Sequence, residues 1–230
     1  MLLKLTMSIC DLPEDQRPRE KLIQQGAHVL SDAELLAVFL RVGVKGKSAV
    51  ELGTEILERF GSLHHLFSAP LKNFSQIHGL GPAKYSQIQA VFELAKRAIS
   101  EDLQKGIALN SPKNVENFLQ LLIGHKTYES FAILFLDVKN GLIQCEELFR
   151  GSLTAAKVYP REIIQRALHH NAAAVILAHN HPSGLTTPSN ADITLTAELI
   201  RVLNTVDVKV LDHFIVAENK IYSFGEHGLL

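Results

Sequence analysis

The stretch that most constrains the fold of this chain is residues 172–204, "AAAVILAHNHPSGLTTPSNADITLTAELIRVLN". It begins with seven consecutive apolar residues, a length typical of a buried strand and short for a buried helix. A loop rich in Pro, Ser and Gly follows, and apolar residues then recur at helical spacing after Ser189, a favoured N-cap residue. A buried strand followed by a helix is a recurring unit of α/β proteins, so this stretch predicts that class for its part of the chain.

The same alternation of strands and helices extends over the rest of the C-terminal half, from about residue 128. The segments "SFAILFLDV" and "LIQCEELF" flank Asn140-Gly141, a dipeptide typical of tight hairpin turns, and predict a β-hairpin. "YPREIIQRALHH" places Pro160 in the first turn of a helical pattern, whereas "VKVLDHFIV" and "KIYSF" predict two more strands. We therefore expect an α/β domain built around a mixed β-sheet.

The N-terminal half has a helical pattern up to about residue 107. Capping-box signatures, in which Ser precedes Glu by three positions, open the expected helices in "SDAELLAVFLRVG" and "SAVELGTEILERFG", and each helix is expected to end at its final Gly. A third helix is expected in "AKYSQIQAVFELAKRAIS", with an apolar stripe made of Ile88, Val91, Phe92 and Ala95. "EDLQKGIALNSPKNV" loses this periodicity and is expected to be a linker. The sequence thus predicts a helical domain at residues 1–107 and an α/β domain at residues 108–230.

Composition disfavours several classes of protein. A net charge of −1 and a pI of about 6.8 give no overall basic field for nucleic acid or an anionic membrane. Cys10 and Cys145 lie far apart in unlike contexts, which favours a reducing compartment over a disulfide framework. The sequence has no signal-peptide pattern at its start and no apolar run near the ~20 residues of a membrane helix. We expect a soluble, cytoplasmic protein with no membrane partner, and no feature indicates its oligomeric state.

The segment after the buried strand carries a set of possible metal ligands. Alternate residues of an extended segment face the same way, so His179 and His181 can converge on one point. If Ser189 caps the next helix, Asp192 lies in its first turn, where an anionic side chain is favoured. Two imidazoles and one carboxylate leave the fourth tetrahedral position of Zn²⁺ for water, as in catalytic zinc sites. The sequence predicts one zinc ion per chain, with the Ser183 hydroxyl as a donor to a developing oxyanion.

"HNHPSG", followed by Asp192, resembles the JAMM/MPN⁺ motif of zinc-dependent isopeptidases. In addition, "LFLDVKNGLI", "ELFRGSL", "YPREIIQRAL" and "LDHFIV" resemble the C-terminal domain of the bacterial RadC family, and the likeness extends over the helical half. The resemblance implies a cytidine-deaminase-like α/β fold of the JAMM type, in which His179, His181 and Asp192 hold zinc. It further implies a zinc metallopeptidase that hydrolyses amide or isopeptide bonds in a protein or peptide substrate.

The JAMM pattern also includes a glutamate beside the first strand of the domain, upstream of the histidines. Glu129 begins that strand in "TYESFAILFLD", fifty positions before His179, and the resemblance implies that it is the general base. Glu146 and Glu147 in the second strand of the hairpin, and Glu162 in "YPRE", remain alternatives.

Two other features bear on the same site. Many relatives carry an acidic residue and a proline after Pro-Ser-Gly, where this chain has Leu185-Thr186. The loop length is preserved, so the departure concerns what docks beside the metal. Asp212-His213 form another polar pair near a strand, and we expect them to support the sheet or the metal ligands instead of binding a second metal.

The segment "QIHGLGPAKYSQIQA" resembles a helix-hairpin-helix motif. A turn at Gly79 and Gly81 would present backbone N–H groups to a DNA phosphate, with Lys84 beside them, independently of base sequence. The alternative is a turn that serves packing or protein docking. Residues 1–107 carry 13 basic and 12 acidic residues, and a net charge of +1 predicts weak, salt-sensitive DNA binding.

Three functions are therefore open at the level of sequence. The leading interpretation is a zinc-dependent hydrolase. The alternative is a DNA-binding accessory protein of repair or recombination, whose metal domain acts on or near nucleic acid. The third is an interaction module in which the metal only stabilises the fold.

Overall fold

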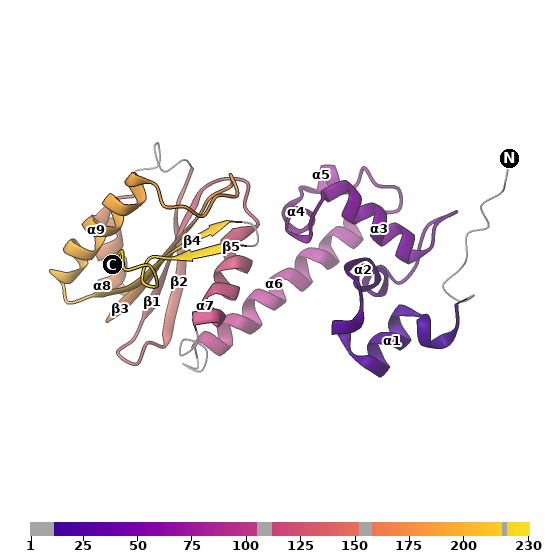
Figure 1. Cartoon of the computed structure of the whole chain (residues 1–230), viewed down its shortest axis with the longest axis horizontal. Helices are drawn as coiled ribbons and strands as arrows, with labels where there is room; N and C mark the ends of the chain where they lie inside the picture. Colours follow the sequence, from indigo (N-terminus) through magenta and orange to yellow (C-terminus); the bar gives the residue numbers. More distant parts are fainter. Residues whose placement is uncertain (1–11, 105–111, 152–157, 218–219) are drawn as a thin grey trace. The chain divides into compact units, whose positions relative to one another are not determined.

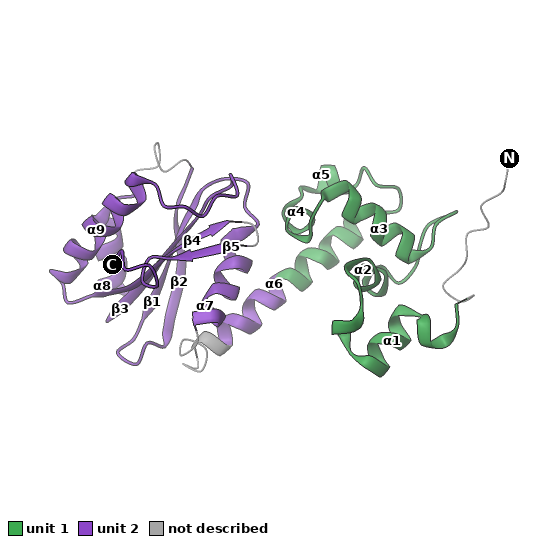
Figure 2. Ribbon diagram, viewed as in Figure 1, with its two compact units in different colours: residues 1–92 green, residues 93–230 purple. Residues whose placement is uncertain are grey.

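The computed structural model describes residues 12–104, 112–151, 158–217 and 220–230. The chain divides into two compact units, Met1–Phe92 and Glu93–Leu230 (Figure 2). The boundary expected between residues 107 and 108 lies outside the described residues, as does Cys10. In the ranges that are described, no helix has both the length and the apolarity needed to cross a membrane.

Short helices build the N-terminal unit around a single apolar core. They are α1 (Pro18–Gln25), α2 (Asp32–Leu40), α3 (Ala49–Phe60), α4 (Leu63–Ser68), α5 (Leu71–Phe74) and the first part of α6 (Pro82–Gln104). Both predicted capping boxes are confirmed, because Ser31 pairs with Glu34 and Ser48 with Glu51, each through its side chain and the backbone N–H of the other residue. Leu52, from α3, and Phe74, from α5, are fully buried in this core.

The apolar stripe expected on α6 is only half correct. Ile88 and Phe92, four positions apart, are buried, but Val91 is 50% exposed and Ala95 is also exposed. Residues four apart lie on one line along a helix, and the core of the unit covers that line alone.

Two helix boundaries also differ from expectation. The helix predicted to end at Gly43 ends at Leu40, because Arg41 adopts a positive φ of 68° and its N–H bonds back to Ala37. The expected linker at residues 101–115 is helical at both of its described ends, since α6 continues to Gln104 and α7 spans Pro112–Leu119. Proline at a first helical position needs no backbone N–H, which explains this start.

The C-terminal unit contains a mixed five-stranded sheet in the order β2-β1-β3-β4-β5. The strands are β1 (Ser130–Leu136), β2 (Leu142–Arg150), β3 (Ala174–Asn180), β4 (Lys209–Ala217) and β5 (Lys220–Ser223). β3 and β4 pair in parallel, and the other three pairs are antiparallel. The predicted hairpin is confirmed, with Asn140 at a φ of 62° in its turn. The expected architecture, a helical N-terminal region followed by an α/β domain with a mixed sheet, is therefore correct.

Helices cover both faces of this sheet (Figure 1). On one face, α7 packs through Val115, Phe118 and Leu119 against one alternating set of strand residues. On the other face, α8 (Pro160–His169) and α9 (Asn190–Asn204) pack against the opposite set. With helices on both sides, β1 and β3 are buried along their whole length, which explains the unbroken apolar runs in their sequences.

Successive side chains of β3 point to opposite faces of the sheet, and this places His179 and Asn180 on different faces. Val175 and Leu177 belong to the core under α8 and α9, so His179, two positions on, faces the same side. Ala178 belongs to the core under α7, and Asn180 therefore faces that side. Two neighbouring polar residues thus reach different parts of the molecule.

Candidate metal centre

The two histidines come from the end of β3. His179 is a strand residue and fully buried, and it pairs with Phe131 of β1 and Ile215 of β4. His181 follows the strand and is half-buried, held by a hydrogen bond of 2.9 Å from its N–H to the carbonyl of Val216. Their Nε2 atoms lie 3.0 Å apart, so the two rings converge as their spacing predicts.

Asp192 reaches the same point from the start of α9. Ser189 is the N-cap of this helix, and its N–H and hydroxyl both donate to Asp192 Oδ2 at 2.7 Å. The carboxylate is buried, and its other oxygen, Oδ1, receives no hydrogen bond from the described residues. A buried carboxylate oxygen without a donor is costly unless something else satisfies it.

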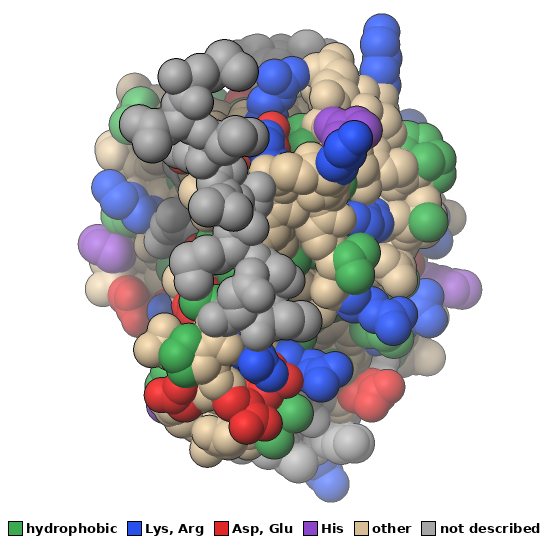
Figure 3. Space-filling model, turned by 90° about the vertical axis from the view of Figure 1, so that its right-hand side faces the viewer, with side chains coloured by type: hydrophobic (Ala, Val, Ile, Leu, Met, Phe, Trp, Pro, Cys, Tyr) green, Lys and Arg blue, Asp and Glu red, His purple; other side chains and the backbone are tan. Residues whose placement is uncertain are grey.

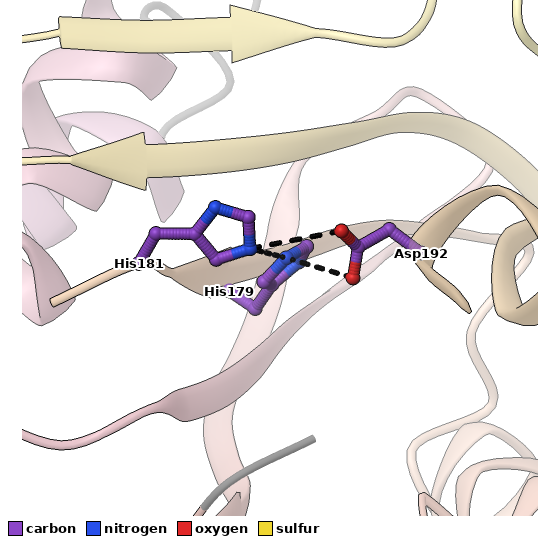
Figure 4. Close-up of side chains that lie close together, drawn as sticks. All are labelled: His179, His181 and Asp192. Atoms are coloured by element: carbon purple, nitrogen blue, oxygen red, sulfur yellow. Dashed lines mark hydrogen bonds and ion pairs between the residues drawn. The ribbon is translucent and has the colours of Figure 1, made fainter. Parts of the chain in front are cut away.

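The three side chains point toward one another, as Figure 4 shows. His179 Nε2 lies 3.3 Å from Asp192 Oδ1, and His181 Nε2 lies 3.6 Å from Asp192 Oδ2. A zinc ion at its usual distance from tetrahedral nitrogen and oxygen ligands separates those ligand atoms by about 3.3–3.4 Å. The ligand atoms of this site already lie close to that spacing, and the bare Oδ1 is one of them. The residues present therefore fit a zinc ion.

The protonation states of these residues agree with a site for a cation. Burial raises the pKa of Asp192, but the contact with His179 and the hydrogen bonds from Ser189 outweigh burial and hold this pKa far below its usual value. Burial lowers the pKa of His179, although the charges of Asp192 and Glu129 act in the opposite direction. Burial also keeps the pKa of His213 well below its usual value, so this ring is neutral. An ionised Asp192 carboxylate beside a neutral His179 imidazole is the state in which these two groups bind metal.

The ring nitrogens of both histidines that face away from the site have hydrogen-bond partners. His181 Nδ1 lies 2.8 Å from the carbonyl oxygen of Leu185, and His179 Nδ1 lies 2.8 Å from His213 Nε2. Such contacts fix the orientation of metal-binding histidines and leave the opposite nitrogen for the ion. His213, which we expected to support the sheet or the ligands, thus contacts a ligand directly.

Glu129 lies just before β1, on the segment that leads into the strand paired with β3. Its side chain is half-buried, and its negative charge is one of those that act on His179. The backbone carbonyl of Glu129 accepts a hydrogen bond of 2.9 Å from Gly151, just beyond β2. The charge of the expected general base therefore acts at one of the candidate ligands.

Asn180, between the two histidines, fastens the segment that carries Glu129. Its Oδ1 accepts from the N–H of Ser130 at 2.7 Å, and its Nδ2 donates to the carbonyls of Lys126 at 3.2 Å and Tyr128 at 3.0 Å. All three bonds cross from β3 to residues about fifty positions earlier in the chain. Sequence reasoning missed this role, and its only signal was a polar residue directed at the apolar side of a buried strand.

Replacing Asn180 by leucine should therefore destabilise the C-terminal unit. The change leaves a buried N–H and two carbonyls without their partner, and one such group costs about 1–3 kcal/mol. We expect urea denaturation to give a free energy of unfolding lower by at least that amount. Asn204→Leu, at the exposed end of α9, is the control, and equal stabilities of the two variants would contradict the role of Asn180.

The three glutamates that were alternatives to Glu129 lie on β2 and α8, and neither element carries a candidate ligand. Glu146 pairs with His170 at 2.7 Å and with Arg166 at 3.4 Å. Glu147 pairs with Lys126 and with Arg150. Both line a polar cleft of about 750 Å³ between β2 and α8, together with Glu162. These positions favour Glu129 over the alternatives as the residue beside the metal ligands.

The loop between His181 and α9 is open to solvent. Ser183 is exposed, and its Oγ accepts a 3.4 Å hydrogen bond from the N–H of Leu185, so its own proton is free for another acceptor. Leu185 uses its carbonyl to hold His181, while its side chain is 67% exposed. An apolar side chain therefore lies at the surface next to a candidate ligand.

The turn expected to contact DNA has a packing explanation for one of its glycines. Gly79 has a φ of 85°, and a Cβ at this position would lie 2.1 Å from Val44 Cγ1, so the residue must be glycine for the turn to pack. Gly81 has open space beside it, and Lys84 lies in the first turn of α6. Acidic and basic side chains lie among one another on the face drawn in Figure 3. DNA contact by this turn remains a prediction.

Comparison with known proteins gives a consistent assignment for both parts of the chain. Residues 109–229 match the family model described as a RadC-like JAB domain, and residues 9–86 match the one described as UPF0758 N-terminal. A UPF0758 protein of Janthinobacterium sp. (strain Marseille) is 64% identical over 97% of this chain and 100% of its own length. UPF0758 proteins of Herminiimonas arsenicoxydans, 64% identical over the same shares, and of Ralstonia nicotianae, 58% identical over 96% of this chain and 99% of the relative, are similar throughout.

Proposed function

Because this chain belongs to the family defined by a UPF0758 N-terminal region and a RadC-like JAB domain, we propose that it is a zinc-dependent hydrolase of amide or isopeptide bonds. The JAB domain is of the JAMM type, a family of metal-dependent hydrolases. The observation that carries the proposal is the buried convergence of His179 Nε2, His181 Nε2 and the donor-free Asp192 Oδ1. Three protein ligands leave one position of a tetrahedral zinc open, which is the arrangement of catalytic zinc sites.

The chemistry divides between the ion and two side chains. Zinc held by His179, His181 and Asp192 would lower the pKa of a water molecule at the site toward neutrality and would polarise the carbonyl of the substrate. Glu129 takes a proton from the attacking water and delivers it to the departing amine. The free proton of the exposed Ser183 hydroxyl stabilises the negative charge that develops on the carbonyl oxygen.

The proposed substrate is a protein or peptide. Ser183, Gly184 and Leu185 line the solvent side of the site, and their exposure leaves room for an extended chain beside the metal ligands. The exposed Leu185 side chain favours an apolar contact with that chain, where an acidic residue would favour a basic one.

Removal of the metal is the first test of this proposal. The native protein should contain one zinc ion per chain, and a chelator should lower its melting temperature. A ligand present at a hundred times its Kd stabilises a fold by about 2.7 kcal/mol, so restored zinc should raise the melting temperature by roughly 5–10 °C. A melting temperature that is equal with and without zinc would contradict a specific site.

Activity separates a hydrolase from a fold that only uses zinc for stability. We expect the zinc-loaded full-length protein to release new amino termini from a peptide library that includes branched isopeptides, detected by mass spectrometry. The chelated protein, with zinc restored as the control, should release none. A zinc-loaded protein that cleaves no member of such a library would favour the stabilising role.

A further inference from the structure

We infer that Thr196 and His213 determine which nitrogen of the His179 ring carries its proton, and are therefore positioning residues for the metal site. The inference rests on the proposed function in that it concerns the same three ligands. Neither residue is itself a member of the ligand set. Each is fully buried.

The chain of hydrogen bonds begins on α9, one turn after Asp192. The hydroxyl of Thr196 donates to the backbone carbonyl of Asp192 at 2.6 Å, and this bond uses its only proton. The same oxygen lies 2.6 Å from His213 Nδ1. Since the hydroxyl has no second proton, it must accept here, and His213 Nδ1 must carry the hydrogen.

The direction of the next bond follows. Full burial favours the neutral form of His213, and a neutral ring has one N–H, which is committed to Thr196, so His213 Nε2 is an acceptor. His179 Nδ1 lies 2.8 Å from this atom and must donate its own N–H to it. His179 Nε2 is then left with a lone pair, and this atom faces His181 and Asp192.

A single backbone contact places a proton on Nδ1 of His181 as well. Its Nδ1 lies 2.8 Å from the carbonyl of Leu185, which can only accept, so Nδ1 carries a proton and the neutral form of the ring has a lone pair on Nε2. Two ring nitrogens 3.0 Å apart thus face each other without a proton between them, beside a carboxylate oxygen that has no donor. Three acceptors that converge in this way repel one another unless a cation lies between them.

Aromatic neighbours hold His213 in the orientation that this arrangement needs. Phe224 stacks on its ring at 4.8 Å between centroids, and Phe131 meets it edge-on at 5.7 Å. Phe131 is also parallel to the His179 ring, at 6.2 Å. The rings therefore have little freedom to turn, and the proton positions depend on the Thr196 hydroxyl.

Loss of the Thr196 hydroxyl should reverse the direction of the hydrogen bond between His213 and His179. In Thr196→Val, His213 Nδ1 has lost its acceptor, and its proton gains a partner by moving to Nε2. His213 would then donate to His179 Nδ1, and the proton of His179 would move to Nε2, where the metal should bind. Metal affinity should fall although every ligand is intact.

The experiment compares matched variants of α9. Thr196→Ser keeps the hydroxyl, and Thr194→Val removes an equivalent hydroxyl, which donates to Asn190 at 2.8 Å on the exposed side of the helix. Competition with a chromogenic chelator should give a zinc Kd for Thr196→Val that is about 10–100 times larger than that of the native protein, the usual effect of losing a hydrogen-bond partner that orients a metal ligand. The two control variants should bind zinc as the native protein does.

A spectroscopic readout tests the same inference without metal. Long-range ¹H–¹⁵N spectra of the zinc-free native protein should show the His179 proton on Nδ1, and those of Thr196→Val should show it shifted toward Nε2. A native His179 protonated on Nε2, or equal zinc affinity in Thr196→Val and Thr194→Val, would overturn the inference. If Thr196→Val does not fold, the native spectrum alone decides. A native protein that binds no zinc would instead refute the proposed function, while the spectrum still reports on the hydrogen bonds.

Discussion

Asp192→Asn is expected to reduce the zinc content of the purified protein from one ion per chain to almost none. The amide keeps the size of the side chain and an oxygen that can accept from Ser189, so the cap of α9 survives. It removes the negative charge, however, and only two neutral imidazoles remain to hold a divalent ion. Zinc is bound by deprotonated ligands that balance its charge. A catalytic site has only three protein ligands, so the loss of one leaves two.

The measurement is elemental analysis of metal per chain, with circular dichroism to confirm the fold. Glu34→Gln is a matched control, because Glu34 is the corresponding capping-box residue of α2 and lies in the other unit. It should retain the full zinc content. Stoichiometric zinc in Asp192→Asn, or in a His179→Ala variant, would show that the ion binds elsewhere and would remove the basis of the proposed hydrolase.

Glu129→Gln is expected to retain zinc and to lose hydrolysis by about 10²–10⁴-fold, the usual contribution of a general acid–base residue. The amide cannot accept a proton from water, and it should leave the hydrogen bonds of Asn180 around it unchanged. The rate is measured on the peptide that the library experiment identifies, at saturating and at low substrate. A loss confined to kcat is the signature of a group that acts in the chemical step.

Glu162→Gln is the control for this experiment. Glu162 is the remaining upstream candidate and lies in the polar cleft between β2 and α8, at the start of α8. Its replacement should leave the rate unchanged. A larger loss in Glu162→Gln than in Glu129→Gln would assign the proton transfer to the cleft and would reverse the proposed roles of the two residues.

The sequence by itself predicted the features that depend only on residues close together along the chain. Seven apolar residues bounded by a turn predict β3, and Ser189, as an N-cap residue, predicts the start of α9. The two-residue period of a strand predicts that His179 and His181 face the same point, and their Nε2 atoms do lie 3.0 Å apart. These features are local because backbone geometry repeats over a few residues.

Only the tertiary structure showed which residues far away in the sequence lie around the candidate metal ligands. The separation of Glu129 from three other glutamates follows from the pairing of β1 with β3, and the bonds of Asn180 depend on the same pairing. The contact of Thr196 with His213 requires α9 to lie against β4. The burial of Phe92 beside an exposed Val91 likewise reflects which side of α6 a core covers. Each is a through-space relation between segments far apart in sequence, and periodicity within one segment carries no information about it.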